Sequence, residues 1–156
     1  MAENKTQVIA EPNRQELTVV REFDAPKELV FKAFSDAEIF AAWMGTQVLH
    51  FDFKKNGSYE FATKNPSGNV VFKAGGAFHD FILNEKIIRT FEMENAPFAV
   101  QIEFLEFENL ENGKCKLTMQ SIFKSVAHRD NLLKLPFAFG LNMAHNGLQE
   151  ILNNKK

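Results

Sequence analysis

Apolar and polar residues alternate with a period of two through the middle of the chain, from Thr46 to Lys124. Such alternation is typical of strands that bury one face. Turn residues separate the alternating runs, and Asn56-Gly57 and Asn112-Gly113 are strong hairpin signals because these residue types tolerate a positive φ. The pattern therefore predicts a meander of six antiparallel strands.

The flanking segments add one strand and several helices. Glu16–Phe23 alternates like a strand, so the sheet is expected to have seven strands. Two short helices follow, because Pro26 suits a first helical turn and Ser35-Asp36-Ala37-Glu38 has the spacing of a capping box. Apolar residues spaced by three and four then predict one long C-terminal helix, with Phe137, Leu141, Ala144, Leu148 and Ile151 on its apolar face.

The first 15 residues differ from the rest of the chain. They are polar, contain Pro12 and show no periodicity, so we predict that residues 1–15 form a flexible N-terminal tail. No repeat, linker or low-complexity segment interrupts residues 16–156, which are expected to form one domain of the α+β class.

The predicted sheet is too wide for one helix to cover. Seven strands about 4.8 Å apart span roughly 29 Å, whereas a helix with its side chains is about 10–12 Å across. We therefore expect the sheet to curl around the C-terminal helix, with a bulge or bend at Gly75-Gly76. The space that remains between sheet and helix is filled either by large side chains or by a ligand.

The amino-acid composition limits the classes of function that this protein can have. The chain has 17 Phe but one Trp and one Tyr, and rings without a polar group suit an apolar interior or an apolar cavity. The net charge of −2, without a basic cluster, argues against nucleic acid and membrane surfaces as partners. Because the one cysteine, Cys115, excludes an internal disulfide and the four histidines lack metal-ligand spacing, we expect neither a metal nor a cofactor.

The location of the protein is inferred from its apolar stretches. Met1–Gln15 lacks the apolar core of a signal peptide, and stretches such as Ile39–Met44 are too short to span a bilayer. We therefore expect a soluble, cytoplasmic protein.

One charged pair is expected to face the interior. Symmetric pairing across the turn at Leu83–Lys86 places Asp80 opposite Arg89, and Phe78 opposite Phe91. Such a pair would anchor a ligand carboxylate or hydroxyl in an otherwise apolar pocket. The alternative is a solvated pair at the rim of the sheet, which contributes only about 0–1 kcal/mol.

The other candidate site residues can each be explained by a structural role as well as by a functional one. Trp43 either gates the pocket or packs the second short helix onto the sheet, and the packing role is the more usual. His50 and His79 are expected on the outer sheet face, and His145 outside the apolar stripe of the last helix, so no catalytic residue is assigned. The expected ligand-binding residues are Trp43, Phe61, Phe72, Phe78, Asp80, Arg89, Phe91, Ile102, Met119, Phe137, Leu141 and Ala144.

The sequence also resembles a known family. The resemblance begins with the run VVREFDAPKELVFKAFSDAEIFAAWMG, which is similar to the opening of the activator of heat-shock-protein-90 ATPase homologue family. The matching positions are Arg21, Phe23, Ala25-Pro26, Val30-Phe31, Ala33-Phe34, Asp36, Trp43 and Gly45. Three later runs resemble the family's hairpin, central strand and terminal helix: FDFKKNGSYEF, EKIIRTFEME and AHNGLQEIL. The resemblance covers Leu17 to Leu152.

This resemblance implies the helix-grip fold of the START-like (SRPBCC) superfamily, which birch pollen allergen and polyketide cyclases share. Two positions depart from the family pattern. The family often has a tandem Trp where this chain has Trp43-Met44, and Gly-Trp where it has Gly147-Leu148. The mouth of the pocket and the packing of the last helix are therefore expected to differ from the family norm.

Three functions remain open at this point. The first is a domain that binds a small lipid-like or aromatic ligand in an apolar pocket between sheet and C-terminal helix. The second is an enzyme of the polyketide cyclase or hydrolase type, which needs polar groups converging in the pocket, such as an inward Glu60, Glu92 or His79. The third is a co-chaperone-like adaptor, whose chaperone partner is implied by the family resemblance only.

Overall fold

The computed structural model describes residues 6–94 and 96–155. Eight strands form one antiparallel sheet in the order β1-β2-β8-β7-β6-β5-β4-β3. The strands are β1 (Gln7–Ile9), β2 (Glu16–Phe23), β3 (Gln47–Phe51), β4 (Gly57–Lys64), β5 (Val70–Ile82), β6 (Lys86–Met93), β7 (Gln101–Asn109) and β8 (Cys115–Ile122). The helices are α1 (Lys27–Ser35), α2 (Ala37–Met44), α3 (Val126–Leu133) and α4 (Phe137–Asn153), with a 3-10 turn, η1, at Glu111–Gly113.

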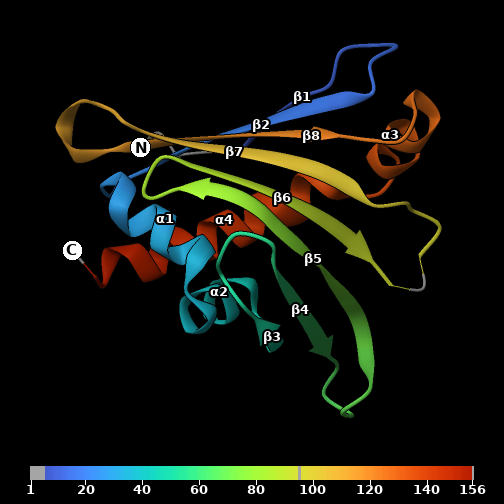
Figure 1. Cartoon of the computed structure of the whole chain (residues 1–156), viewed down its shortest axis with the longest axis horizontal. Coiled ribbons are helices and arrows are strands. Elements are labelled where there is room, and N and C mark those ends of the chain that lie inside the picture. The colour runs from blue at the N-terminus through green and yellow to red at the C-terminus, as the bar shows by residue number, and fades with distance from the viewer. Residues whose placement is uncertain (1–5, 95, 156) are drawn as a thin grey trace.

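The sheet curves around α4, as Figure 1 shows. The long C-terminal helix lies on the concave side of the sheet, and it contacts α1, α2 and α3. The predicted α+β helix-grip fold is therefore confirmed. Within the described ranges, none of the helices has the length and hydrophobicity that a membrane-spanning helix needs.

The sheet has one strand more than the seven predicted. The additional strand, β1, lies within the segment predicted as a flexible tail, and it pairs antiparallel with β2 so that Val8 lies opposite Val19. A strand of three residues at the edge of a sheet is too short to show a periodic pattern, which is why the sequence did not reveal it. Residues 1–5 of the predicted tail lie outside the described residues.

Hydrogen bonds at the ends of the helices determine where α2 begins and how it is attached to α1. The cap of α2 is Asp36, whose carboxylate accepts from the backbone N–H of Glu38 and Ile39 at 3.0 and 3.1 Å, so the cap lies one residue later than predicted. Trp43, near the end of α2, donates its indole N–H to the carbonyl of Ala33 in α1 at 2.8 Å. This bond holds the two helices together, and the ring of Trp43 packs at 5.0 Å from that of Phe34 and at 5.7 Å from that of Phe40.

Two glycines allow β4, β5 and β6 to approach closely where β5 bends. A Cβ atom on Gly75 would lie 2.3 Å from the carbonyl oxygen of Tyr59, and one on Gly76 would lie 2.1 Å from that of Thr90. The strands pair without a register shift at this point. Of the two alternatives predicted at Gly75-Gly76, a bulge or a bend, the bulge is absent there and lies instead between Phe78 and Asp80, further along β5.

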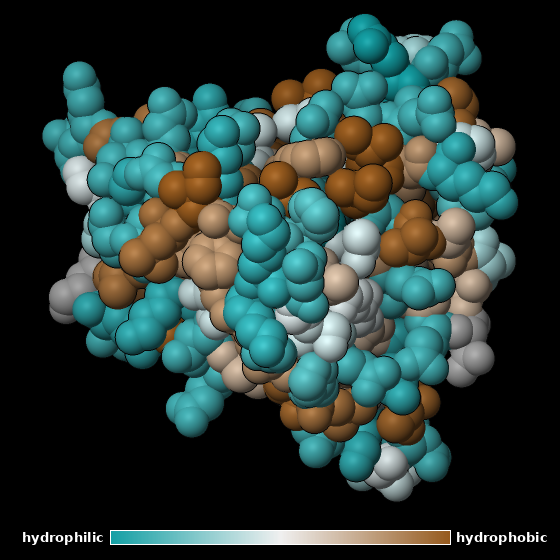
Figure 2. Space-filling view, in the orientation of Figure 1, coloured by the Kyte–Doolittle hydropathy of each residue, from teal (hydrophilic) through white to brown (hydrophobic). Residues whose placement is uncertain are grey.

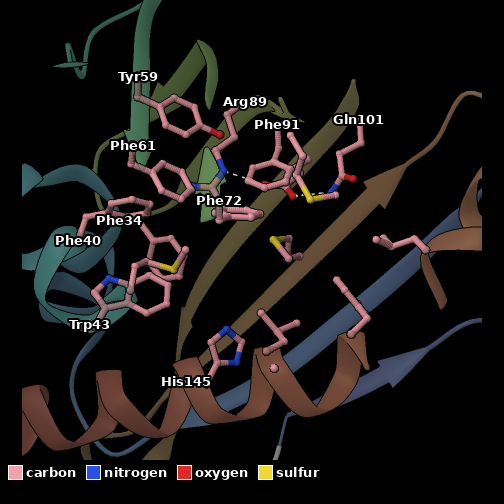
Figure 3. A pocket seen from close by; sticks show the side chains of 18 of the residues that line it. Phe34, Phe40, Trp43, Tyr59, Phe61, Phe72, Arg89, Phe91, Gln101 and His145 are labelled. Carbon is pink, nitrogen blue, oxygen red and sulfur yellow. Dashed lines mark hydrogen bonds and ion pairs between the residues drawn. The ribbon is translucent and has the colours of Figure 1, made fainter. Parts of the chain in front are cut away.

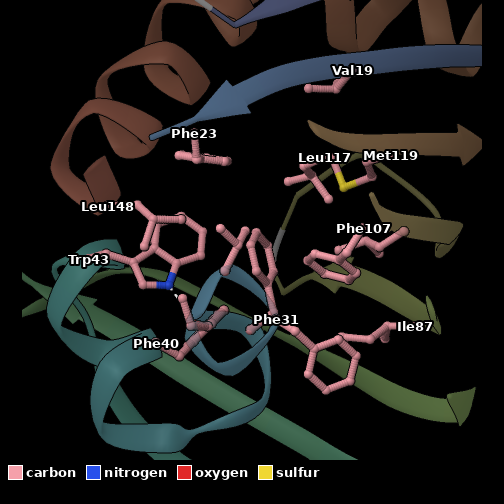
Figure 4. Packing of buried hydrophobic residues seen from close by; sticks show 14 of the residues in the cluster. Val19, Phe23, Phe31, Phe40, Trp43, Ile87, Phe107, Leu117, Met119 and Leu148 are labelled. Carbon is pink, nitrogen blue, oxygen red and sulfur yellow. Dashed lines mark hydrogen bonds between the residues drawn. The ribbon is translucent and has the colours of Figure 1, made fainter. Parts of the chain in front are cut away.

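Aromatic side chains make up much of the core beneath α1 and α2 (Figure 4). The ring of Phe31 lies 5.2 Å from that of Phe107 and 5.9 Å from that of Phe53, both in edge-to-face geometry. Cys115 is fully buried beside this core, and burial raises the pKa of its thiol to about 11. The cysteine is therefore a small apolar core residue, as expected from its strand phase.

Candidate functional site

A cavity of about 480 Å³ lies between the concave face of the sheet and α4 (Figure 3). Its volume falls in the range typical of small-molecule sites. Aromatic and aliphatic side chains form most of its wall, with rings from α1 and α2 on one side and from β4, β5 and β6 on another. Leu135, Pro136 and Gly140 line the cavity and are also exposed, so it opens near the α3–α4 connection.

The structure brings most of the predicted site residues to this cavity. Those that line it are Trp43, Phe61, Phe72, Arg89, Phe91, Met119, Phe137 and Leu141. The four that do not are Phe78, Asp80, Ile102 and Ala144. The role of the lining residues in binding a ligand stays a prediction.

Three of the four residues lie outside the cavity for different reasons. Phe78 is completely buried, but it packs beneath Phe53 and Tyr59 with ring centroids 4.8 Å from each. Ile102 is 43% exposed, because its neighbours Gln101 and Glu103 occupy the inward face at the start of β7. Ala144 is half-buried on α4 and packs against the core beside the cavity.

The predicted pairing of Asp80 with Arg89 is wrong. The loop between β5 and β6 has three residues, so Ile82 pairs with Lys86, and a bulge follows before Phe78. These two shifts place Asp80 opposite Ile88 and Phe78 opposite Arg89. Symmetric pairing across a turn of two or four residues cannot reproduce this register.

Arg89 pairs instead with Glu103, which the sequence analysis did not single out. Its Nε donates to Oε1 of Glu103 at 2.8 Å, and Nε2 of Gln101 donates to the other carboxylate oxygen at 2.8 Å. All three residues are buried, with less than a tenth of each residue exposed. The sequence did contain a signal that Gln101 and Glu103 face inward, because they alternate in phase with Leu105 and Phe107, which are buried on the same face of β7.

The Arg89–Glu103 pair is electrically balanced. Burial lowers the pKa of Arg89, but the charge of Glu103, the electrostatic interaction with Tyr59 and the hydrogen bond to Glu103 together outweigh burial, so the net pKa is raised. The guanidinium also lies over the rings of Phe34 and Tyr59, with its central carbon 5.7 and 5.8 Å from their centroids. The sheet side of the cavity therefore carries a fixed dipole without net charge.

A second polar group lies on the helix side of the cavity. His145 is 2% exposed and lines the cavity, so the prediction that it lies outside the apolar stripe is wrong. The inward face of α4 runs through Leu141, His145, Leu148 and Leu152, spaced 4, 3 and 4. Leu141 and Leu148 belong to the predicted face, whereas His145 and Leu152 take the places predicted for Ala144 and Ile151. His50 and His79 are exposed, as predicted.

The His145 imidazole belongs to a hydrogen-bond network that joins the N-terminal segment to β2 and α4. Its Nδ1 lies 2.6 Å from Oγ1 of Thr6, and Arg21 Nη1 donates to the same Oγ1 at 3.3 Å. Arg21 also donates to the side-chain carbonyls of Asn142 and Asn146 at 3.1 and 2.9 Å. None of these residues was a sequence candidate for the site.

The stability of the protein is expected to depend on the protonation of His145. Burial, and then the charge of Arg21, lowers the pKa of His145 to about 3, whereas a free histidine titrates near pH 6.5. Between these values the unfolded chain binds one proton more, so the free energy of unfolding should fall on acidification by up to about 1.4 kcal/mol per pH unit. Urea unfolding at pH 7 and pH 5 measures this slope.

Two histidine variants separate this effect from general acid unfolding. His145→Gln should remove most of the slope between pH 7 and pH 5, and His79→Gln, at an exposed position, should leave it unchanged. An equally steep slope in His145→Gln would contradict the assignment.

The residues that would favour catalysis do not converge on the cavity. Glu60 is half-buried and lies 3.6 Å from Nζ of Lys73, and Glu92 and His79 are exposed. Within residues 6–94 and 96–155, no group of three or more His, Cys, Asp or Glu side chains has an arrangement that could hold a metal ion.

Comparison with solved structures supports the fold. A protein from Rhodobacter sphaeroides aligns with a TM-score of 0.86 and 18% identity, over 97% of this chain and 99% of that one. A protein from Mycobacterium smegmatis aligns with a TM-score of 0.82 and 17% identity, over 94% and 96%. An HSP90 activator from Plasmodium falciparum aligns with a TM-score of 0.64 and 20% identity, over 89% and 96%.

The family is shown by the sequence itself. A search of the curated proteins gave no match. The family model described as activator of Hsp90 ATPase homolog 1-like protein, however, matches residues 24–153, from the residue after β2 to the end of α4. The resemblance seen in the sequence is thus confirmed, and the chain belongs to the activator of Hsp90 ATPase homolog 1-like family.

Proposed function

We propose that this protein binds a small, largely apolar molecule, lipid-like or aromatic, in the cavity between the sheet and α4. The observation that carries the proposal is a cavity of about 480 Å³ in a chain whose other aromatic rings pack tightly. Protein interiors seldom leave voids of this size, because each lining atom loses dispersion contacts. A guest molecule would restore those contacts.

The polar groups of the cavity favour binding over catalysis. Both carboxylate oxygens of Glu103 already accept hydrogen bonds, and Arg89 keeps its proton. His145 is a weak base at neutral pH, because its pKa lies near 3. These groups are thus better suited to orient a ligand than to transfer a proton.

The balanced Arg89–Glu103 pair also favours an uncharged ligand group at the sheet side. A carboxylate there would meet the negative charge of Glu103 as well as the positive charge of Arg89. We therefore propose a hydroxyl or carbonyl group at this position, in place of the carboxylate that an isolated arginine would attract.

Ligand binding can be tested with a neutral fluorescent probe, N-phenyl-1-naphthylamine, and with native mass spectrometry of gently purified protein. Leu141→Trp fills part of the cavity from α4 and should weaken the binding of the probe at least about tenfold. The matched control is Met143→Trp on the same helix, because Met143 is 55% exposed and does not line the cavity.

Two results would contradict a binding role for the cavity. If no ligand is retained during purification, and neither the probe nor a panel of fatty acids, sterols and aromatic polyketides raises the melting temperature, the cavity has no binding role. Equal binding of the probe by the Leu141→Trp and Met143→Trp variants would also contradict it.

A role as a co-chaperone-like adaptor has weaker support in the structure. On the face shown in Figure 2, hydrophobic residues lie in several separate patches among polar ones. The chaperone partner thus rests on the family name and on the description of the Plasmodium falciparum neighbour. Stimulation of the host chaperone's ATPase activity by the purified protein would test this role. A cytoplasmic location remains a prediction from the sequence.

A further inference from the structure

His145 reaches the cavity from the side opposite to Arg89 and Gln101. In Figure 3 its imidazole points from α4 toward the cavity, whereas the two strand residues approach from the sheet. The ring is held between the edge of Phe23, at 5.5 Å between centroids, and the indole of Trp43, at 6.3 Å. The imidazole is therefore a fixed part of the cavity wall.

The hydrogen bonds behind His145 determine which nitrogen carries its proton. A guanidinium can only donate, so Arg21 Nη1 supplies a proton to Oγ1 of Thr6. The second lone pair of Oγ1 could also accept from His145, but the hydroxyl proton of Thr6 would then have no acceptor among the described residues, because Nδ1 of His145, 2.6 Å away, is the one that lies within reach. Because the ring is neutral, Nδ1 is left without a proton and Nε2 bears the N–H group.

Thr6 and Arg21 are themselves held in place. The backbone N–H of Thr6 donates to Oδ1 of Asn142 at 3.0 Å, and Arg21 donates to the same oxygen and to Asn146. Arg21 is 2% exposed, and the acceptors that it has among the described residues are all uncharged. Its positive charge lies behind the imidazole and increases the polarity of the Nε2–H group.

The donor group of His145 has no partner within the described part of the chain. Its Nδ1 is used by Thr6, and Nε2 has no hydrogen-bond partner among the described residues. In those same residues, the fully buried side-chain atoms without a partner are Arg21 Nε and Ser121 Oγ, so His145 Nε2 is open to the cavity that the residue lines. A donor in such a position is satisfied by a ligand or by water. The cavity is where such a partner fits.

Building on the proposed function, we propose that His145 Nε2–H selects the ligand by donating a hydrogen bond to it. The ligand class is then an uncharged apolar molecule with an acceptor oxygen, a ketone, ester or ether, and cationic amines are disfavoured. Thr6 and Arg21 are positioning residues, because they fix the tautomer of His145 without touching the ligand. The N-terminal segment is thereby part of the binding site.

The tautomer can be measured without any ligand. Two-bond ¹H–¹⁵N NMR spectra of the ¹⁵N-labelled full chain distinguish the two nitrogens of a neutral imidazole, and His145→Gln identifies the His145 signals. We expect the Nε2–H form in the wild type and a mixture of tautomers in Thr6→Val. The Nδ1–H form in the wild type would overturn the proposal.

Ligand selection is measured with three probes of equal length: 2-decanone, decane and decylamine, each displacing N-phenyl-1-naphthylamine. His145→Phe keeps a flat ring but removes the donor, so it should weaken 2-decanone binding by about 2- to 12-fold more than decane binding. Decylamine should bind wild type more weakly than either of the others. Thr6→Val keeps the imidazole and should show a smaller loss for 2-decanone.

The outcomes separate this inference from the proposed function. If none of the probes binds to the wild type, the proposed function fails, while the NMR result still decides the tautomer. If 2-decanone and decane bind but lose affinity equally in both His145→Phe and Thr6→Val, the cavity is a binding site and His145 only shapes its wall.

Discussion

Replacing Glu103 by leucine is expected to lower the free energy of unfolding by about 3–5 kcal/mol, because Arg89 is left buried without a partner. Nε of Arg89 donates to Glu103 at 2.8 Å, and the side chains of the two residues are 10% and 5% exposed. Gln101 loses its acceptor in the same variant. Urea unfolding at neutral pH measures the change.

Two further variants show whether the loss comes from the unpaired charge. Glu106→Leu changes an exposed residue on the same strand and should alter stability by no more than about 0.5 kcal/mol. Arg89→Met combined with Glu103→Leu replaces both charges with apolar groups and should recover most of the lost stability. A Glu103→Leu variant as stable as the wild type would show that Arg89 finds water or another partner.

The alternation of apolar residues was sufficient to predict the overall architecture. The helix-grip fold follows from seven recognisable strands, two short helices and a long terminal helix, and the width argument led to a space beneath α4. Eight of the twelve predicted site residues line that space, Phe61 and Phe91 among them. Periodicity predicts these positions well because large apolar side chains are strongly favoured on the side of the sheet that is shielded from water.

The polar part of the site could not be predicted in the same way. The partner of Arg89 depends on strand register, which a three-residue loop and a bulge near His79 shift by amounts that the apolar pattern does not encode. Glu103 resembles its exposed neighbours Glu106 and Glu108 in sequence, and only its phase with Leu105 distinguishes it.

His145 was misplaced for a related reason. On a helix, residues four apart differ by about 40° and residues three apart by about 60°, so both Ala144 and His145 lie next to Leu141 and Leu148, at opposite edges of the predicted stripe. The packing of α4 against α1 and α2, which places Leu148 and Leu152 at the centre of the buried face, decides between them. That packing is a tertiary property, and it also brings Thr6 and Arg21 to the ring.

Phe78→Ala is expected to lower the free energy of unfolding by about 3–5 kcal/mol, because a filled part of the core would be replaced by a void. The ring of Phe78 is completely buried, with those of Phe51, Phe53 and Tyr59 at 5.4, 4.8 and 4.8 Å between centroids. Thermal and urea unfolding measure the loss.

Phe91→Ala is the matched comparison, because it removes the same side chain from the neighbouring strand. Phe91 is half-buried and lines the cavity, so it has fewer packing contacts to lose and its removal only enlarges an existing space. We expect it to cost less than about 2 kcal/mol and to admit bulkier ligands. An equal loss from the two variants would mean that the region around Phe91 is as tightly packed as that around Phe78, and the cavity would then be too small for a guest.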